Sequence, residues 1–433
     1  MKKKNSFLRF GDVAKFRNGL NFTKESRGSG CPLIGIPDFQ NRFTPNYDSL
    51  EEIDPSGLAS EEDYLQKHDI IFVRSNGNKA LVGRSLYLDR DIRALFSGFC
   101  IRARIFADEL DPRFCAYFTR SKHFKKSISS SAGTNINNLN QDILGDVAIP
   151  RIDKDRQLAI AELLGSLDAK VELNNRINEE LEGLAKLLYD YWFVQFDFPI
   201  TAAQAAAMGK PKLEDKPYRA SGGKMIHNET LKREIPEGWL PGNLELLGKI
   251  VGGSTPSTEK TEYFCKVGTP WITPKDLSDN SGNRFIDRGS MCVTSEGIKA
   301  ASLKLLPAGT VLMSSRAPIG YLAIARNPVT TNQGFKSFVP EKAFSGDYIY
   351  FTLKHFMKLI KANASGSTFK EISGGTLKAV RLHLPPDDLV ARFTERVSSL
   401  SSQQSLLEQQ NQQLTELRDW LLPMLMNGQV TVG

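Results

Sequence analysis

Two kinds of hydrophobic pattern alternate along the 433-residue chain. Short apolar runs, such as 69–74, are interrupted by Gly, Pro and Asn, which is typical of strands joined by loops. After each such region, apolar residues recur at a spacing of three and four, which is typical of a helix. The pattern predicts mixed α and β domains at 1–153 and 235–386, each followed by a long helix, at 154–196 and 387–428.

Both helical segments keep a heptad repeat in which positions a and d are mostly apolar. In the first helix these positions hold Leu164, Leu167, Val171, Asn174, Asn178, Leu181, Ala185, Leu188 and Trp192. In the second they hold Val397, Leu400, Gln404, Leu407, Asn411, Leu414, Arg418, Leu421 and Leu425. Such a repeat predicts a coiled-coil seam, and about 40 residues would form a rod of roughly 60 Å. Asn178 and Asn411 occupy equivalent positions in the two repeats. They either fix the register of the seam or lie at its solvent-exposed edge.

The second half of the chain repeats the first at an offset of 233 residues. Tyr-Phe-Thr at 117–119 recurs at 350–352 with this offset, and earlier in each half a looser match relates Pro-Leu-Ile at 32–34 to Pro-Trp-Ile at 270–272. Because solenoid repeats are only about 20 to 50 residues long, this offset indicates a duplicated domain. A duplicated unit is expected to associate about a pseudo-two-fold axis, which would make the two long helices antiparallel.

An aromatic run ends the first helix, and a segment with the composition of a linker follows at 197–234. The run holds more aromatic surface than one thin seam can bury. It therefore either packs on the next domain of the same chain or forms a docking surface for another protein. The candidate docking residues are Tyr189, Trp192, Phe193 and Phe196, together with Trp420 in the second helix.

Composition and charge set limits on the function. No apolar run is long enough to span a membrane, and the basic N-terminus lacks the apolar segment of a signal peptide, so we expect a cytoplasmic protein. The five cysteines are scattered, which argues against a structural zinc site. The formal net charge of +7 points weakly to a polyanionic partner.

The motifs of common catalytic sites are missing from the sequence. It has no phosphate-binding G-x-x-x-x-G-K-[ST] loop, no amino-methyltransferase signature and no histidines at metal-ligand spacing. Glu214 and Lys216 have the spacing of a nuclease motif, but no strand is predicted around them. The sequence thus favours a reader or scaffold over an enzyme, with no catalytic residue and no metal or cofactor bound by this chain.

Polar and basic loops beside the predicted strands are the candidate DNA contacts. Arg and Lys can contact guanine edges, Asn and Gln can contact adenine edges, and all four can reach phosphates. Any single cation here can equally be a solvated surface charge, but the loops occur in two copies with different residues, as expected if each copy reads a different sequence. In the first domain the candidates are Arg74, Asn76, Asn78, Lys79, Arg84, Thr134, Asn135 and Asn137. In the second domain they are Lys275, Ser315, Arg316, Asn332, Gln333, Lys336, Ser367, Thr368 and Lys370.

Over essentially its whole length the chain resembles the specificity subunit of type I restriction-modification systems. The resemblance rests on the order of domain, helix, domain, helix and on local phrases. Residues 188–198 look like the end of the family's central helix, and Ile235–Trp239 looks like the entry to its second recognition domain. Thr331–Phe335 and Pro270–Asp276 resemble framework phrases of that domain, whereas Phe96–Phe99 departs from them in the first.

The resemblance implies an α+β protein with two α/β target-recognition domains, whose helices form an antiparallel coiled coil with pseudo-two-fold symmetry. Each domain would bind one half of a bipartite double-stranded DNA site, and the helices would set the spacer between the halves. Two modification (methyltransferase) subunits would dock on the helices and methylate adenine with S-adenosylmethionine. Two restriction (motor-nuclease) subunits would use ATP and Mg²⁺.

Three other functions stay open on the sequence alone. The first is an enzyme with its own catalytic domain, against which the missing motifs argue. The second is a coiled-coil scaffold, which would not need two domains with divergent polar loops. The third is a DNA-binding regulator, which would bind DNA but no methyltransferase subunit.

Overall fold

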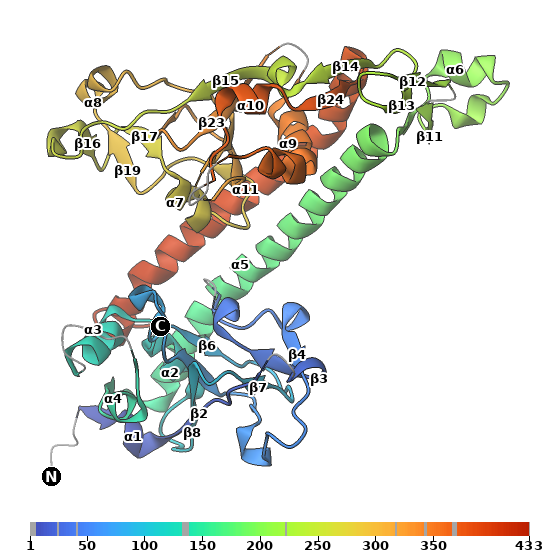
Figure 1. Ribbon diagram of the computed structural model, residues 1–433. Helices are drawn as coiled ribbons and strands as arrows, with labels where there is room; N and C mark the ends of the chain where they lie inside the picture. Colours follow the sequence, from blue (N-terminus) through green and yellow to red (C-terminus); the bar gives the residue numbers. More distant parts are fainter. Residues whose placement is uncertain are drawn as a thin grey trace, which may run out of the picture. The chain divides into compact units, whose positions relative to one another are not determined.

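The computed structural model describes residues 6–23, 26–39, 42–131, 138–220, 223–316, 318–341, 344–365 and 370–432. They form two compact units, of which the first is Met1–Leu173 with Asn411–Gly433 and the second is Asn174–Gln410. Helices α5 (Lys154–Tyr189) and α11 (Asp387–Met426) are the longest elements (Figure 1). Each of them contributes one end to the first unit and the other end to the second.

Among its described residues the first unit contains three small sheets, the smallest of which is the antiparallel pair β1-β9. An antiparallel sheet has the order β2-β8-β5-β6, and a second sheet has the order β4-β3-β7, in which β3 and β7 run parallel. Its strands are β1 (Phe7–Arg9), β2 (Ala14–Asn18), β3 (Arg27–Ile34), β4 (Glu51–Ile53), β5 (Ile70–Val73), β6 (Ser85–Tyr87), β7 (Leu95–Phe96), β8 (Cys100–Ile105) and β9 (Ala148–Pro150). Its short helices are α1 (Phe10–Val13), α2 (Pro112–Phe118), α3 (Lys122–Ser131) and α4 (Gln141–Gly145).

The second unit has a five-stranded sheet of order β15-β23-β20-β21-β18 and a four-stranded sheet of order β16-β19-β17-β22. Its strands after residue 239 are β14 (Leu240–Asn243), β15 (Gly248–Gly252), β16 (Phe264–Cys265), β17 (Thr269–Ile272), β18 (Phe285–Ile286), β19 (Met291–Val293), β20 (Val311–Met313), β21 (Leu322–Ala325), β22 (Thr330–Thr331), β23 (Lys336–Pro340) and β24 (Arg381–Leu384). Its helices there are α7 (Pro274–Asp279), α8 (Ser295–Ala300), α9 (Gly346–Ala362) and α10 (Gly374–Lys378).

The two units share one strand topology, which confirms the predicted duplication. The order β2-β8-β5-β6 matches β15-β23-β20-β21, and β4-β3-β7 matches β19-β17-β22. The parallel pair also recurs, because Leu33 faces Leu95 in the first unit and Trp271 faces Thr330 in the second. The repeated triplets at 32–34 and 270–272 contribute to the equivalent strands β3 and β17.

The long helices α5 and α11 begin at residues 154 and 387, the starts predicted for them from the sequence. A single π-helical turn, Asp190–Val194, follows α5, and Phe196 then takes a left-handed backbone conformation with φ of 65°. This conformation is uncommon for a bulky residue and cannot continue a helix, which explains the abrupt end of α5. Burial of the Phe196 side chain offsets the strain.

The segment 197–234, which we predicted as a linker from composition, contains regular structure. Its elements are β10 (Asp197–Pro199), α6 (Ala202–Ala207), β11 (Pro217–Arg219), β12 (Met225–Asn228) and β13 (Arg233–Pro236), the last of which ends beyond it. Strand β10 pairs with β11 and β12 pairs with β13, while Ile200 is fully buried. Composition alone could not reveal this, because alanine-rich and lysine-rich stretches occur both in linkers and in short helices.

Each unit has a hydrophobic core that includes residues of both long helices. In the first unit, Leu164 of α5 and Leu425 of α11 belong to one buried cluster with strand β5. In the second unit, Ala185 of α5 and Val397 of α11 belong to one cluster with helix α9. The helices are therefore part of each domain's core.

Candidate nucleic-acid interface

In the second unit, three of the predicted DNA-contacting segments meet at one junction. The backbone N–H of Ser315 donates to the carbonyl of Gly334 at 2.8 Å, and the N–H of Ile372 donates to the carbonyl of Ser315 at 3.1 Å. An isolated bridge also joins Arg316 to Glu371. The junction places Ser315, Arg316, Asn332, Gln333 and Lys370 on neighbouring loops, although they are up to 55 positions apart in sequence.

The first unit contains the same three-segment junction. The N–H of Arg74 donates to the carbonyl of Phe99 at 2.7 Å, and the N–H of Leu139 donates to the carbonyl of Arg74 at 2.8 Å. Ser75 forms an isolated bridge with Asn138. The side chain of Phe99 is exposed at this junction. Loop residues at the ends of paired strands are thus held in the same way in both units, but with different side chains.

In the first unit, two side chains of the polar loop between β5 and β6 are used for hydrogen bonds within the loop itself. The side-chain oxygen of Asn76 accepts the N–H of Asn78 at 2.7 Å, and the side-chain oxygen of Asn78 accepts the N–H of Ala80 at 3.1 Å. A bidentate contact with adenine would have to share these oxygens. Lys79 is exposed, and Arg74 and Arg84 are partly buried.

In the second unit, several candidates already have partners on the protein. Arg316 lies 3.9 Å from Glu371, and Gln333 accepts a hydrogen bond from Thr255. Lys275 is exposed on α7, and its hydrogen bond to Asp279, 2.7 Å long, raises its pKa. Exposed ion pairs of this kind contribute little to stability, so breaking one to contact DNA would cost little.

The remaining candidates of the second unit differ in accessibility. Asn332 accepts the N–H of Gly334 at 2.9 Å and so shapes its own turn. Lys336 is partly buried and Lys370 is exposed. Ser315 is fully buried, which makes a direct DNA contact by its hydroxyl unfavourable. Thr134, Asn135, Asn137, Ser367 and Thr368 lie outside the described residues.

The aromatic end of α5 lies in the core of the second unit. Trp192 and Phe193 are each 1% exposed, and Tyr189 and Phe196 are also buried. Phe193 packs edge-to-face on Tyr348 at 4.9 Å and on Phe393 at 5.1 Å between ring centroids. The docking prediction is not supported at these four positions, because their own chain encloses them. Trp420, in contrast, is 56% exposed.

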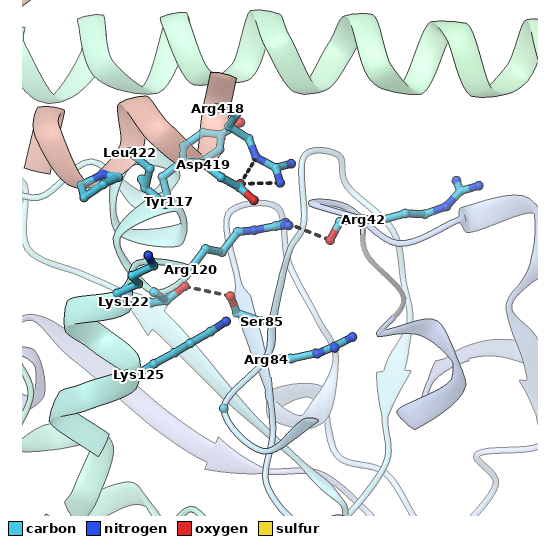
Figure 2. A pocket seen from close by; sticks show the side chains of 13 residues that line it. Arg42, Arg84, Ser85, Tyr117, Arg120, Lys122, Lys125, Arg418, Asp419 and Leu422 are labelled. Carbon is cyan, nitrogen blue, oxygen red and sulfur yellow. Dashed lines mark hydrogen bonds and ion pairs between the residues drawn. The ribbon is translucent and has the colours of Figure 1, made fainter. Parts of the chain in front are cut away.

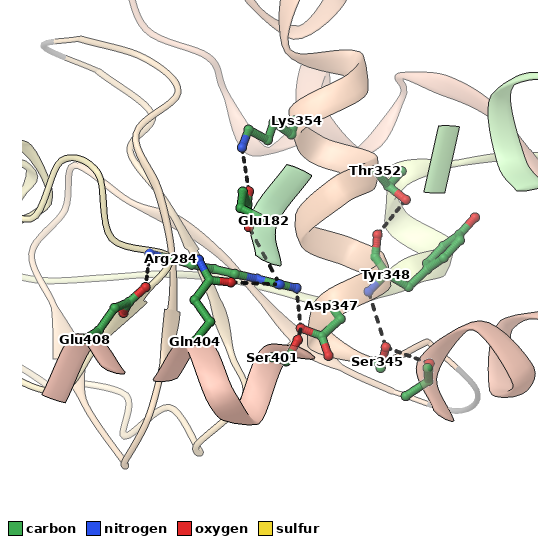
Figure 3. A network of polar contacts seen from close by, with 11 residues as sticks. Glu182, Arg284, Ser345, Asp347, Tyr348, Thr352, Lys354, Ser401, Gln404 and Glu408 are labelled. Carbon is green, nitrogen blue, oxygen red and sulfur yellow. Dashed lines mark hydrogen bonds and ion pairs between the residues drawn. The ribbon is translucent and has the colours of Figure 1, made fainter. Parts of the chain in front are cut away.

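A buried network around Arg284 joins the globular part of the second unit to both long helices, as Figure 3 shows. The guanidinium of Arg284 contacts Asp347 of α9 and lies 3.7 Å from Glu182 of α5. It also donates to Gln404 of α11 at 3.5 Å. The side chain is 1% exposed, so breaking one of these contacts would leave a buried charge without its partner.

A smaller contact of the same kind exists in the first unit. Tyr117 of α2 donates to Asp168 of α5 at 2.8 Å, and Asp168 pairs with Arg418 of α11 at 2.6 Å. Burial raises the pKa of Tyr117, so its hydroxyl stays protonated and donates. The repeated Tyr-Phe-Thr motif therefore includes a residue that joins a recognition domain to the helices.

The sequence did not single out Arg284 as a structural residue. An isolated arginine beside Asn283 and a glycine resembles a solvated loop charge, and only the fold brings three acidic or amide side chains to it. Asp168 and Arg418 are closer to being predictable, because Arg418 occupies a seam position of the heptad, where a charge needs a partner.

Comparison of the sequence with models of known protein families identifies the family of this chain. The model for the type I restriction modification DNA specificity domain matches the chain twice, at residues 2–183 and 236–416. The chain belongs to this specificity family. Each match covers one recognition domain and most of the long helix that follows it, in agreement with the duplication.

Curated members of the specificity family are similar to the chain. The specificity subunit of the type I restriction enzyme HindI from Haemophilus influenzae is 27% identical over 413 residues, which are 84% of this chain and 87% of that protein. The MjaIX specificity subunit from Methanocaldococcus jannaschii is 40% identical over 189 residues, which are 42% of this chain and 43% of that protein. In the second alignment the chain thus spans less than half of its relative.

A solved structure in the specificity family has the same fold. The type I restriction-modification S subunit from M. genitalium aligns over 98% of both chains with a TM-score of 0.52 and 15% identity. Within the described part of this chain, no three His, Cys, Asp or Glu side chains are grouped so that they could hold a metal ion. No helix among the described residues is long and apolar enough to cross a membrane.

Proposed function

We propose that this chain selects the DNA target of a type I restriction-modification complex by binding a bipartite site. Each unit would contact one half-site through its three-segment junction. The observation that carries this proposal is the junction itself, which recurs once in each unit with a common backbone arrangement and different side chains. Two domains that bind different DNA sequences need a common backbone arrangement and different side chains on the loops that contact the bases.

The two long helices would form an antiparallel coiled coil that sets the spacer between the half-sites. Side-chain contacts between α5 and α11 support this pairing in each unit. Asp168 pairs with Arg418 in the first, and Asn174 donates to Gln410 at 2.8 Å in the second. In both helices the heptad positions are buried or partly buried.

The chain would act without catalysing a reaction itself. Modification subunits, two in our proposal, would dock on the helices and methylate an adenine in each half-site with S-adenosylmethionine. Restriction subunits would bring ATP and Mg²⁺, and this chain would bind none of these small molecules. The complex would work in the cytoplasm, where the host DNA lies. Trp420 is the remaining aromatic candidate for the docking surface.

The decisive experiment is co-expression with a modification (methyltransferase) subunit from the same genome, followed by mapping of methylated adenines in the host DNA. We expect one motif with two fixed half-sites and a fixed gap. If the proteins fail to co-purify and no bipartite motif appears, the chain is instead a DNA-binding regulator or a scaffold.

A further inference from the structure

A cavity of about 230 Å³ in the first unit has no role in the function described so far. Four parts of the unit line it: the loop at Arg42, the end of the β5–β6 loop at Arg84, the region from α2 to α3, and the C-terminal end of α11 (Figure 2). The cavity therefore lies where the first recognition domain contacts helix α11.

The lining of the cavity carries much more positive than negative charge. Six of its side chains are cationic and only Asp419 is acidic. Arg42 pairs with Glu172 at 2.9 Å, and Arg418 pairs with Asp168 and Asp419. The other four cations form no ion pair with any residue that the structure describes. They are Arg84, Arg120, Lys122 and Lys125.

Arg120 lies in the cavity without an ion pair to any residue that the structure describes, and the charges of Asp168 and Asp419 compensate its own only in part. Its guanidinium donates to the carbonyl of Arg42 at 2.9 Å, which satisfies a hydrogen bond without neutralising the charge. Burial and the nearby charge of Arg418 lower its pKa. Like charges gathered in a partly enclosed space repel one another, so an anion in the cavity would relieve an unfavourable arrangement.

We propose that this cavity binds a phosphate group of the DNA backbone, an inference that rests on the proposed function. Arginine and lysine are the usual protein partners of phosphate. The cavity is smaller than the roughly 300–1,000 Å³ of sites that enclose a whole small molecule, so it fits one group of a larger ligand. Arg84 ends the loop that carries the DNA candidates of the first unit.

The bound phosphate would tie two elements together. Lys122 and Lys125 belong to α3 of the recognition domain, whereas Arg418 belongs to α11. One anion contacted from both elements holds the end of α11 against the domain. DNA binding would thereby stiffen the joint between the first recognition domain and the helix that follows the second.

The test compares Lys125→Gln with Lys126→Gln in the complex of the full chain with its methyltransferase. Both lysines are exposed on α3, but only Lys125 lines the cavity, so the variants have equal net charge and matched chemistry. For Lys125→Gln we expect the slope of log affinity against log salt to fall by about 0.9, the share of one phosphate contact. Affinity for target and non-target DNA should drop by the same factor, and Lys126→Gln should behave as the wild type.

A second measurement separates DNA phosphate from a free anion. Inorganic phosphate and pyrophosphate are added without DNA, and the melting temperature of the same three proteins is recorded. An unchanged salt slope together with a phosphate-induced rise in melting temperature that Lys125→Gln alone loses would assign the cavity to a free phosphate anion and overturn the DNA source. Equal behaviour of both variants in both assays would overturn the phosphate site altogether.

The test of the phosphate site can fail or succeed independently of the test of the proposed function. The methylated motif tests target selection and does not require the cavity. A bipartite motif that is unchanged in Lys125→Gln, together with a reduced salt slope, is the result expected if both inferences hold. A missing motif with an intact phosphate effect would remove the proposed function and leave an anion site.

Discussion

Glu408 of helix α11 accepts a hydrogen bond from the backbone amide of Arg284 at 2.8 Å. Its second carboxylate oxygen accepts the amide of Phe285 at 3.1 Å and the guanidinium of Arg326 at 2.6 Å. One side chain of the helix thus holds the edge strand β18 and a basic residue next to β21. Since Glu408 is buried, its contacts are made away from water and should matter for stability.

Replacing Glu408 by alanine is expected to destabilise the second unit by about 3–5 kcal/mol, because the guanidinium of Arg326, whose side chain is 10% exposed, then loses its charged partner. Burial raises the pKa of Glu408 to about 7, so Glu408→Gln, which resembles the protonated carboxyl, should cost less. The measurement is urea unfolding followed by tryptophan fluorescence, since three of the four tryptophans lie in the second unit. Glu395→Ala, at an exposed position of α11, is the control. Equal midpoints for the two alanine variants would contradict the prediction.

His383 should make the stability of the second unit depend on pH. It is buried in β24, its Nε2 donates to the carbonyl of Phe193 at 2.7 Å, and burial lowers its pKa to about 4 from the ordinary value of 6.5. The folded state therefore holds a neutral imidazole that the unfolded state protonates first. This contribution is present above pH 6.5 and is lost as the pH falls towards 4, by about 2–3 kcal/mol.

The check for His383 is the unfolding midpoint measured between pH 7.5 and 5. His383→Gln should flatten the decline on acidification, whereas His227→Gln, at an exposed position of β12, should leave it unchanged. A decline of the same size in all three proteins would show that other groups cause it.

The aromatic residues at the end of α5 should act on stability, and Trp420 should act on assembly. Trp192→Ala and Phe193→Ala each remove a buried ring and should cost about 3–5 kcal/mol by circular dichroism. Trp420→Ala should change stability by less than about 0.5 kcal/mol, as expected for an exposed residue, and should weaken co-purification with the methyltransferase. Normal thermal stability of Trp192→Ala would show that the ring is not part of the core.

Arg316 should affect one half-site only. If its guanidinium leaves Glu371 to contact a base edge, Arg316→Ala should cost about 1–3 kcal/mol of discrimination at one position of one half-site. Mapping of methylated adenines would reveal a relaxed base there and an unchanged second half-site. Lys249→Ala, exposed on β15 and away from the junction, is the control. Relaxation in both half-sites would contradict the assignment of one half-site to each unit.

Inserting one heptad into a long helix should change the spacer and leave both half-sites as they are. Seven residues add about 10 Å of helix, which corresponds to roughly three base pairs of DNA. The methylated motif of the variant gives the new gap directly. An unchanged gap would show that the helices do not set the spacing.

The sequence predicted the parts of the fold that depend on repetition. The heptad predicted that residues 164–192 and 397–425 belong to two long helices, because a period sustained over many turns leaves little freedom of assignment. The 233-residue offset predicted the duplication, which the matched strand orders confirm. In both cases many residues contribute the same signal.

The sequence could not predict features that depend on which distant residues meet. Arg284 and Arg120 look like surface cations in the sequence, and the contacts of buried Arg284 with Asp347 and of half-buried Arg120 with Arg42 follow only from the fold. Ser315 is likewise buried where its backbone pairs with Gly334 and Ile372, which are distant in sequence. The aromatic run allowed two interpretations, because a large apolar surface is the same in sequence whether its own chain or a partner covers it.

The discontinuity of the first unit sets an order for its folding during synthesis. Residues 1–173 leave the ribosome long before 411–433, although Leu425 and Met426 belong to the same core as Leu164. The second unit is continuous and can be completed while the first still lacks its last helical segment. The core of the N-terminal recognition domain therefore stays incomplete and partly exposed until residues 411–433 have been synthesised. A chain cut short before residue 411 would leave that domain unfinished, even though every residue of the domain itself had been made.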